Sequence, residues 1–487
     1  MIPTRLIDVG EEGQESVRLC EMEKWNTDQK RELRYIALSY PWGIPSRHEH
    51  TFTTRENFGR FVHGIAISDL PHTLRDAVQI TRGLGLRYIW IDALCIIQGP
   101  GGDWIDEAKH MEMIFGNAYC VIAADRATGS SSGFLQERPT RKFVRFEKSP
   151  AGSLYVCEAI DDFQRDLIDG RLRMRAWVLQ ERALARRTIY FTETQTYWEC
   201  GIGIRCETLT RMRKCVVKRL LQNDGYEAHN SFSIKAAFLG DPNFPQLATN
   251  MSKGGQINVF LHLYEYYSRL HLSRPSDKAV AIAGVEKRII RAFDTQGGFG
   301  VFERYLGRSL LWHRDPDLGY LRKIEYPEHQ NSVPTWSWMA YDGAITFIEI
   351  SFGGVVWETE EIHSPWSTGH TLSPPPEAIR LTDSYRNFDL LCRVRDFNLA
   401  LAGTQVRIFY DLDETSQARG QGVKCVVVGK QRAEPGVANV AELEFYVLLV
   451  ALRHSGQGTD VYERVGAASL PGICIDLNEP GRTVRVS

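Results

Sequence analysis

The chain has 487 residues, and its 58 Lys and Arg nearly balance its 60 Asp and Glu. Apolar residues make up 43% of it, which is enough to build hydrophobic cores and excludes disorder as the main state. The near-neutral charge gives no general attraction to nucleic acid or to acidic lipid. At about 100–200 residues per domain, the length predicts two to four domains.

Neither a membrane span nor a secretory leader is predicted. The longest apolar run, at residues 445–452, is far shorter than the roughly 20 residues that a spanning helix needs. The first residues carry no apolar run long enough for a signal peptide, so we expect a cytoplasmic chain. The cysteines are then expected to be reduced, and those in apolar runs to be small buried hydrophobic residues: Cys95, Cys120, Cys425 and Cys474.

Strand and helix signals alternate in the N-terminal third. Apolar runs predict buried strands at residues 35–40, 88–92 and 119–124. Helical spacing predicts a helix at residues 70–84, with Ser68 and Asp69 as caps, and another at residues 103–117, with Asp103 as its cap. This alternation predicts an α/β fold with a parallel sheet flanked by helices, in which sites form beyond the C-terminal ends of the strands.

The rest of the chain shows different patterns. A helix is predicted at residues 172–184, followed by strands at 188–192 and 196–200. The signal is mostly helical from about residue 215 to residue 312, and many short β-type runs follow residue 333. We therefore predict an α/β domain at residues 1–214, a helical extension at residues 215–332 and a β-rich C-terminal domain at residues 333–487.

Glu107 has an unusual position in the helix predicted after Asp103. Trp104, Ala108 and Met111 belong to the apolar stripe of that helix, and Glu107 lies at the edge of the stripe, toward the sheet. Two interpretations remain open. The carboxylate is a first-turn residue stabilised by the helix dipole, with or without an Arg partner. Alternatively, it is a cleft residue that stabilises a developing cation or binds a sugar hydroxyl.

Five ordered motifs between residues 35 and 200 resemble the fungal heterokaryon-incompatibility (HET) domain. They fall in the segments 35–43, 70–78, 84–98, 103–124 and 175–200, of which residues 84–98 are the most specific. The later segments 267–284 and 334–338 are similar to what often follows this domain. The chain departs from the family pattern at Pro41, where Cys or Arg is often seen, and at Ala93, where Ser is often seen.

This resemblance implies a role in non-self recognition and regulated cell death. The HET domain is regarded as related to the TIR fold, a flavodoxin-like sheet whose enzymes cleave NAD at the nicotinamide–ribose bond. Asp103-Trp104-x-x-Glu107 is similar to the catalytic segment of some of those enzymes, which implies that Glu107 is catalytic. NAD is then a substrate rather than a bound cofactor, and the resemblance also implies a homo-oligomer as the active form.

The candidate substrate-binding residues follow the predicted strands or lie in the predicted helices. We expect Trp42, with Tyr40 second, to hold the nicotinamide ring, and Ser39 and Asp92 to contact ribose or phosphate. The alternatives are that Asp92 bonds loop amides and that Trp42 anchors packing. No metal ligand is predicted, and the full binding set is Ser39, Tyr40, Trp42, Gly43, Asp92, Cys95, Trp104, Arg175, Trp177, Gln180 and Glu181.

Three functions remain open. The first is an NAD-cleaving cell-death effector, the second a non-catalytic signalling module that assembles partner proteins, and the third a nucleosidase acting on another nucleotide. The polar face of the helix at residues 172–184 either lines the site or fixes the helix to the sheet. The sequence contains no phosphate-binding P-loop motif, no dinucleotide-binding glycine motif after a strand and no esterase nucleophile elbow.

Overall fold

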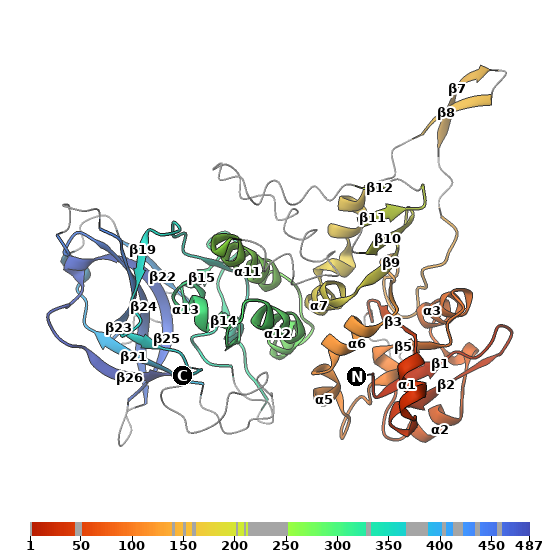
Figure 1. The fold of residues 1–487 in the computed structure, drawn as a ribbon, viewed down its shortest axis with the longest axis horizontal. Coiled ribbons are helices and arrows are strands. Elements are labelled where there is room, and N and C mark those ends of the chain that lie inside the picture. The colour runs from red at the N-terminus through yellow and green to blue at the C-terminus, as the bar shows by residue number, and fades with distance from the viewer. Residues whose placement is uncertain are drawn as a thin grey trace. The chain divides into compact units, whose positions relative to one another are not determined.

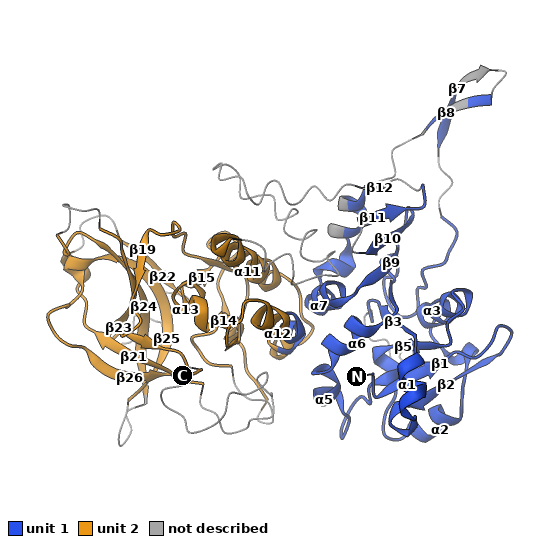
Figure 2. Cartoon of the chain, in the orientation of Figure 1, with its two compact units in different colours: residues 1–247, 280–285 blue, residues 248–279, 286–487 orange. Residues whose placement is uncertain are grey.

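The computed structural model describes residues 2–43, 51–138, 142–149, 152–157, 162–200, 203–208, 211–212, 252–327, 333–366, 388–401, 406–412, 422–433, 439–454 and 460–487. The chain divides into two compact units (Figure 2). Unit 1 holds residues 1–247 and 280–285, and unit 2 holds residues 248–279 and 286–487. The predicted helical stretch at 215–251 lies outside the described residues, and the predicted division into three domains stays a prediction.

Among the described residues, unit 1 contains a ten-stranded sheet in the order β12-β11-β10-β9-β6-β3-β5-β1-β2-β4. The strands are β1 (Arg5–Asp8), β2 (Ser16–Glu21), β3 (Tyr35–Ser39), β4 (Ile65–Ala66), β5 (Tyr88–Trp90), β6 (Cys120–Ala123), β9 (Arg187–Phe191), β10 (Thr196–Cys200), β11 (Gly203–Cys206) and β12 (Arg211–Met212). A separate hairpin pairs β7 (Phe143–Ser149) with β8 (Gly152–Cys157).

The centre of this sheet confirms the predicted parallel arrangement. β3 pairs in parallel with β5 on one side and β6 on the other, and β6 pairs in parallel with β9. Across the sheet these four strands lie in the order β5-β3-β6-β9, and along the chain they come second, first, third and fourth. The chain therefore passes from β3 to β5 on one side and then back to β6 on the other side, so the direction of winding reverses between β3 and β6. Strands β1 and β2, which pair antiparallel beside β5, were not predicted.

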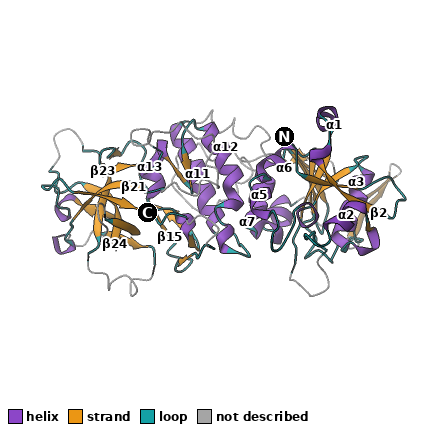
Figure 3. Ribbon diagram, turned by 90° about the horizontal axis from the view of Figure 1, so that it is seen from below, coloured by secondary structure: helices purple, strands orange, loops and turns teal. Residues whose placement is uncertain are grey.

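Helices cover both faces of the sheet (Figures 1 and 3). On one face lie α5 (Trp104–Ala108), α6 (Met111–Asn117) and α7 (Ala176–Leu184), and on the other lie α2 (Phe58–His63) and α3 (His72–Gly83). The described part of unit 1 also contains α1 (Thr27–Glu32) and the single turn α4 (Asp92–Cys95). This arrangement confirms a mixed α/β unit with a sheet flanked by helices.

Two details of the predicted helices are wrong. The helix predicted at residues 103–117 is divided into α5 and α6, because the His110 N–H bonds the Glu107 carbonyl three residues earlier and makes a tight turn. Asp103 does not cap α5 with its side chain, since its carboxylate accepts a 2.8 Å bond from the Ile97 N–H and pairs with Arg5.

The helix predicted at residues 70–84 also starts differently. A 3-10 turn occupies Ile67–Asp69, and Pro71 becomes the N-cap residue of α3 without any side-chain cap. Ser68 and Asp69 therefore do not cap this helix. Leu84, which was included in its apolar face, is 46% exposed because the helix ends at Gly83.

Unit 2 begins with helices and small β-ladders. Its helices are α11 (Lys253–Ser268), most of α12 (Ala283–Ala292) and α13 (Leu306–Leu310). Two-stranded ladders join β13 (Gly297–Gly298) to β14 (Val301–Phe302), β15 (Trp312–Arg314) to β18 (Ile345–Phe347), and β16 (Arg322–Lys323) to β17 (Tyr341–Asp342). Trp312, Trp336 and Trp338 are fully buried in this part of unit 2.

The C-terminal part of unit 2 is a larger sheet and confirms the predicted β-rich region. Its strands are β19 (Val355–Trp357), β20 (Ile362–His363), β21 (Leu390–Arg395), β22 (Arg407–Tyr410), β23 (Lys424–Gln431), β24 (Glu444–His454), β25 (Val461–Pro471) and β26 (Arg482–Val486). Because β21 pairs with both β26 and β23, the ring β23-β24-β25-β26-β21 closes on itself. Val447, Leu449 and Leu470 belong to a buried apolar cluster of this sheet.

The cysteines and the apolar segments agree with the sequence analysis where the structure describes them. Cys95, Cys120, Cys425 and Cys474 are buried free thiols. In the described part of the chain, none of the helices combines the length and the apolar character needed to cross a membrane.

Candidate functional site

Polar and aromatic side chains gather beyond the C-terminal ends of β3 and β5. Ser39 is the last residue of β3, and Tyr40 and Trp42 follow it. Asp92 comes two residues after the end of β5 and is the first residue of α4. Because β3 and β5 are parallel, their C-terminal ends lie at the same edge of the sheet, where sites form in α/β folds.

Three donors hold the Asp92 carboxylate. It accepts 2.7 Å hydrogen bonds from the indole Nε1 of Trp42 and from the N–H of Ala93, and a further bond from the Tyr40 hydroxyl. Burial raises the pKa of Asp92, and these donors oppose the rise. The interaction with the Ala93 amide agrees with one of the predicted alternatives, and the indole and phenol bonds also fasten the loop after β3 to α4.

Helix α7 brings a second carboxylate to the same edge. Its N-cap residue Arg175 donates a 2.6 Å hydrogen bond to the Tyr40 carbonyl. Burial raises the pKa of Glu181 to about 7, an effect that Asp92 reinforces and that Ser39 and Arg175 oppose. We call Ser39, Tyr40, Trp42, Asp92, Arg175 and Glu181 the strand-end cluster, because their contacts and charges link them into one group.

Glu107 lies in a different polar group. It is 4% exposed, and one carboxylate oxygen lies 3.9 Å from Nη2 of Arg5. Burial raises the pKa of Glu107, whereas a hydrogen bond from Thr4 and the charge of Arg5 lower it. The carboxylate therefore faces inward, as the periodicity predicts, and has the Arg partner of the first interpretation. Its Oε2 atom is buried without a hydrogen-bond partner, so the second interpretation also remains open.

The single turn α4 is a neighbour of both Glu107 and the strand-end cluster. Arg5 donates a 2.7 Å bond from Nε to the carbonyl of Cys95, the last residue of α4. Cys95 is fully buried, and burial raises the pKa of its thiol to about 12, with smaller contributions from Glu107 and Asp92. Among the described residues, no hydrogen bond or ion pair joins Glu107 directly to Asp92 or to Glu181.

Three more candidate residues connect the helices. The rings of Trp104 and Trp177 meet edge to face with centroids 6.0 Å apart, which links α5 to α7. Gln180 is 1% exposed, and its Oε1 accepts a 2.7 Å bond from the Gly284 N–H within unit 1. This contact joins α7 to the start of α12 (Ala283–Ala292) rather than to the sheet, so both interpretations of the polar face remain predictions.

Gly43 ends the described loop after β3 in a left-handed backbone conformation, with φ of +85°. A Cβ atom at this position would lie 3.0 Å from Cα of Gly129. The loop after β3 and the loop at residues 128–130 therefore approach each other at their backbones, and the Ser130 N–H bonds the Trp42 carbonyl at 3.2 Å.

Residues 35–181 match a family model described as heterokaryon incompatibility protein (HET). The matched segment, which we call the HET region, is less than half of the chain. It begins at the first residue of β3 and ends at Glu181, so it contains the whole strand-end cluster and Glu107. No curated protein and no solved structure matches the chain significantly.

Sequence reasoning missed four residues around the candidate site. Thr4 and Arg5 lie before the HET region, and no periodicity marks them because Arg5–Asp8 is buried throughout. Asp125 and Arg173 form a buried pair at 3.0 Å beyond the end of β6. Two sequence features could have pointed to this pair. Asp125 comes directly after a predicted strand, and Arg173 belongs to a run of alternating arginines before α7.

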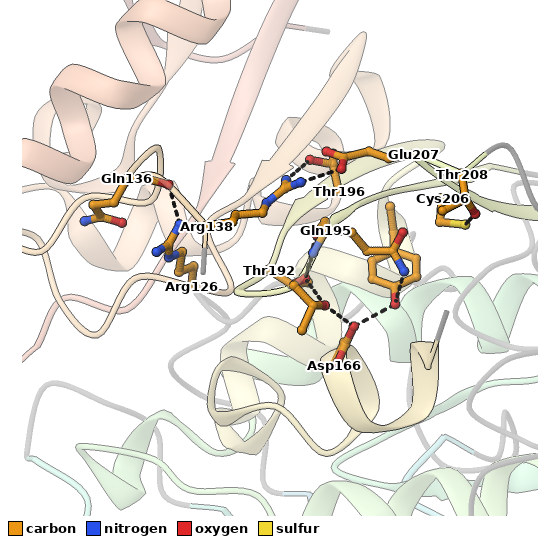
Figure 4. Close-up of polar contacts among 12 residues, drawn as sticks. Arg126, Gln136, Arg138, Asp166, Thr192, Gln195, Thr196, Cys206, Glu207 and Thr208 are labelled. Atoms are coloured by element: carbon orange, nitrogen blue, oxygen red, sulfur yellow. Dashed lines mark hydrogen bonds and ion pairs between the residues drawn. The ribbon is translucent and has the colours of Figure 1, made fainter. Parts of the chain in front are cut away.

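A second polar network in unit 1 lies around β10 (Figure 4). The Asp166 carboxylate, on the π-helical turn Gln164–Ile168, accepts a 2.7 Å bond from the Tyr197 hydroxyl. Arg138 donates a 2.8 Å bond to Thr196 and pairs with Glu207. These contacts join strands to neighbouring segments and include none of the candidate residues, so we assign them a structural role.

A groove of about 880 Å³ lies elsewhere in unit 1. Its lining includes the α3 residues His72, Arg75 and Gln79 together with Ile189 and Phe191 of β9. None of the candidate catalytic or binding residues lines this groove. The strand-end cluster remains the part of unit 1 in which the predicted site residues come together.

Proposed function

We propose that the HET region is an effector of heterokaryon incompatibility and regulated cell death, and that it cleaves NAD at the nicotinamide–ribose bond. The match of residues 35–181 supports the first part of the proposal. The second rests on the gathering of carboxylates and aromatic side chains at the edge where the parallel strands end. The strand order second, first, third, fourth is also that of flavodoxin-like sheets, which supports a TIR-like relationship.

The proposed reaction needs few catalytic groups. Nicotinamide leaves a cationic glycoside as a neutral base, so the leaving group needs no strong acid. The transition state resembles an oxocarbenium ion, and a carboxylate held near the ribose stabilises it electrostatically. We assign this part to Glu107, whose second oxygen has no protein partner, and we assign the nicotinamide shelf to Trp42.

The proposal also includes the setting in which the HET region acts. We propose a cytoplasmic homo-oligomer that responds to a recognition partner protein, with the β-rich part of the chain serving regulation or assembly. NAD is the substrate in this scheme, and no resident cofactor is invoked. The homo-oligomer and the recognition partner rest on the family match of residues 35–181 and on the resemblance of the motifs.

Nicotinamide release by the purified chain tests the catalytic proposal. Wild-type protein, as monomer and after cross-linking into oligomers, is incubated with NAD, and free nicotinamide is measured by chromatography. Glu107→Gln is expected to lower the rate about 100-fold or more, because the neutral amide cannot balance the developing cation. Asp106→Asn is the matched control, since Asp106 is the preceding α5 residue, with a side chain 73% exposed.

Two results would decide against NAD cleavage. If wild type and Glu107→Gln release nicotinamide equally slowly in every form, the enzymatic proposal fails. If Glu107→Gln also kills fungal cells as wild type does, the non-catalytic assembly module replaces it. Parallel incubations with NADP, ATP and nucleosides identify the third candidate, a nucleosidase for another nucleotide.

A further inference from the structure

Arg175 brings a positive charge to the loop after β3. It lies directly before the first residue of α7, and its Nη1 donates a 2.6 Å hydrogen bond to the carbonyl of Tyr40. Tyr40 comes two residues before Trp42, the residue proposed above to hold the nicotinamide ring. The bond therefore places a guanidinium beside the backbone of the loop that carries the proposed nicotinamide shelf.

The charge of Arg175 has no ion-pair partner in the part of the chain that the structure describes, because its hydrogen bond goes to a neutral carbonyl. Arg175 is also only half-buried, which leaves it open to a ligand from solvent. Arg173, two residues earlier, differs in both respects. It is 5% exposed, and its Nη2 lies 3.0 Å from both carboxylate oxygens of Asp125. Arg175 is therefore the arginine of this segment that can still bind an anion.

The place of Arg175 at the end of α7 points the same way. Arg175 is the N-cap residue of this helix and provides no side-chain cap. Ser, Thr, Asp and Asn are preferred at such a position, because their side chains accept bonds from the first helical N–H groups. A cation is unfavourable there, since those N–H groups give the N-terminus of a helix a partial positive charge. An anion bound to the guanidinium of Arg175 offsets this repulsion.

We propose that Arg175 binds the pyrophosphate of NAD and so selects substrates that carry phosphate, a role that rests on the function proposed above. A guanidinium binds phosphate oxygens with two parallel N–H bonds, which give both affinity and orientation. In NAD a single ribose separates the nicotinamide from the nearer phosphate, so the two groups need neighbouring sites. Trp42 and the Tyr40 carbonyl that Arg175 contacts belong to one short loop. The carboxylate of Asp92 repels a phosphate, so it cannot take this part.

Three substrates with different numbers of phosphates test this assignment. Nicotinamide release from NAD, nicotinamide mononucleotide and nicotinamide riboside is measured for wild type, Arg175→Gln and the control Arg171→Gln. Arg171 is an exposed arginine of the same segment. We expect Arg175→Gln to raise KM for NAD about 10- to 100-fold with little change in kcat, because a charge-assisted contact with phosphate is lost. Nicotinamide riboside has no phosphate, so its kcat/KM should be the same in Arg175→Gln and in wild type.

Two further measurements address the chemistry of the contact. Arg175→Lys keeps the charge but loses the paired N–H groups, so its KM for NAD should lie between those of wild type and Arg175→Gln. Calorimetry with ADP-ribose, the product that keeps the pyrophosphate, measures binding without turnover. Its Kd should rise about 10- to 100-fold in Arg175→Gln and stay unchanged in Arg171→Gln.

The outcomes separate this assignment from the function on which it rests. If wild type binds ADP-ribose through Arg175 but releases no nicotinamide, NAD cleavage fails and the phosphate site stands. If wild type cleaves NAD and Arg175→Gln keeps its KM, the assignment is overturned. The same holds if Arg175→Gln loses an equal factor on all three substrates, since a folding defect does not depend on phosphate. If wild type neither cleaves NAD nor binds ADP-ribose, both proposals fail.

Discussion

The indole Nε1 of Trp42 donates a 2.7 Å hydrogen bond to the carboxylate of Asp92. The two residues are 50 positions apart and follow adjacent parallel strands, β3 and β5. Their bond fixes the loop after β3 against the start of α4. The bond therefore fixes the position of Trp42 relative to Asp92 in the candidate site.

Replacing Trp42 by Phe removes this donor while keeping an aromatic ring. The pKa of Asp92 should rise further, because a donor that now opposes the effect of burial is lost. We expect the free energy of unfolding at pH 7 to fall by about 1–3 kcal/mol, and by less at pH 4, because burial raises the pKa of Asp92 and acid therefore favours its neutral form. Urea unfolding at both pH values measures this. Trp25→Phe is the control, because the Trp25 ring packs edge to face on Tyr88, outside the strand-end cluster, with centroids 5.2 Å apart.

Replacing Arg5 by Gln tests whether the arginine stabilises the carboxylates of Asp103 and Glu107. Arg5 is 6% exposed and bonds Asp103, with Glu107 3.9 Å away. Losing the charge leaves the carboxylates of Asp103 and Glu107 without their cationic partner, and we expect a loss of about 2–4 kcal/mol at pH 7 that shrinks in acid, because burial raises the pKa of Glu107. Arg18→Gln is the matched control, because Arg18 pairs with Asp8 but its side chain is 56% exposed, so its loss should cost less than about 1 kcal/mol. Equal losses in the two variants would contradict the prediction.

The sequence predicts the centre of the sheet well, because the physical signal is local. Three apolar runs separated by helical spacing specify buried parallel strands, and these appear as β3, β5 and β6. The inward position of Glu107 is also local, since it follows from helical periodicity within α5. The antiparallel strand β1 carries no such signal, because Arg5 and Asp8 are as buried as the apolar residues between them.

The composition of the strand-end cluster depends on contacts far apart in the chain. Arg175 bonds the carbonyl of Tyr40, 135 residues away, and no local pattern predicts that pairing. The motif resemblance brought Glu181 into the candidate set, but its relation to Ser39 depends on how α7 packs on the sheet. Sequence reasoning therefore found the residue and could not find its neighbours in the fold.

Gly43→Ala tests the backbone approach at the end of the loop after β3. Alanine is strained at φ of +85°, and its Cβ would lie 3.0 Å from the backbone of Gly129, which cannot rotate away. We expect a loss of about 2–3 kcal/mol, compared with about 1 kcal/mol for Gly85→Ala, where φ is +68° but no atom lies within 4 Å. Thermal unfolding of both variants measures the difference. Similar melting temperatures would mean that the neighbouring loop moves aside at little cost.

Stability should depend on pH through Glu181 in a direction opposite to that of an ion-paired carboxylate. Its pKa is about 7 in the folded chain, against an ordinary value of 4.5 for a glutamate, so the folded protein holds this proton more tightly than the unfolded chain does. Stability is therefore lost as pH rises from about 4.5 to about 7. Glu181→Gln should gain about 1–3 kcal/mol relative to wild type at pH 8 and nothing at pH 4. Urea unfolding across this range checks it, with Glu193→Gln expected to follow wild type throughout.

Arg464 and Asp411 form a buried ion pair in unit 2 that a double-mutant cycle can test. Both side chains are 0% exposed and 3.2 Å apart, and burial raises the pKa of Asp411 to about 6 despite the arginine. Arg464→Met leaves the buried Asp411 carboxylate without its cationic partner. The free energy of unfolding should fall by about 3–5 kcal/mol at pH 7. The loss should be smaller at pH 4, where Asp411 is protonated in both proteins. Adding Asp411→Leu to Arg464→Met should recover most of the loss, because an apolar pair needs no desolvated charge. If the double variant instead loses the sum of the two single losses in urea unfolding, the two charges are not coupled.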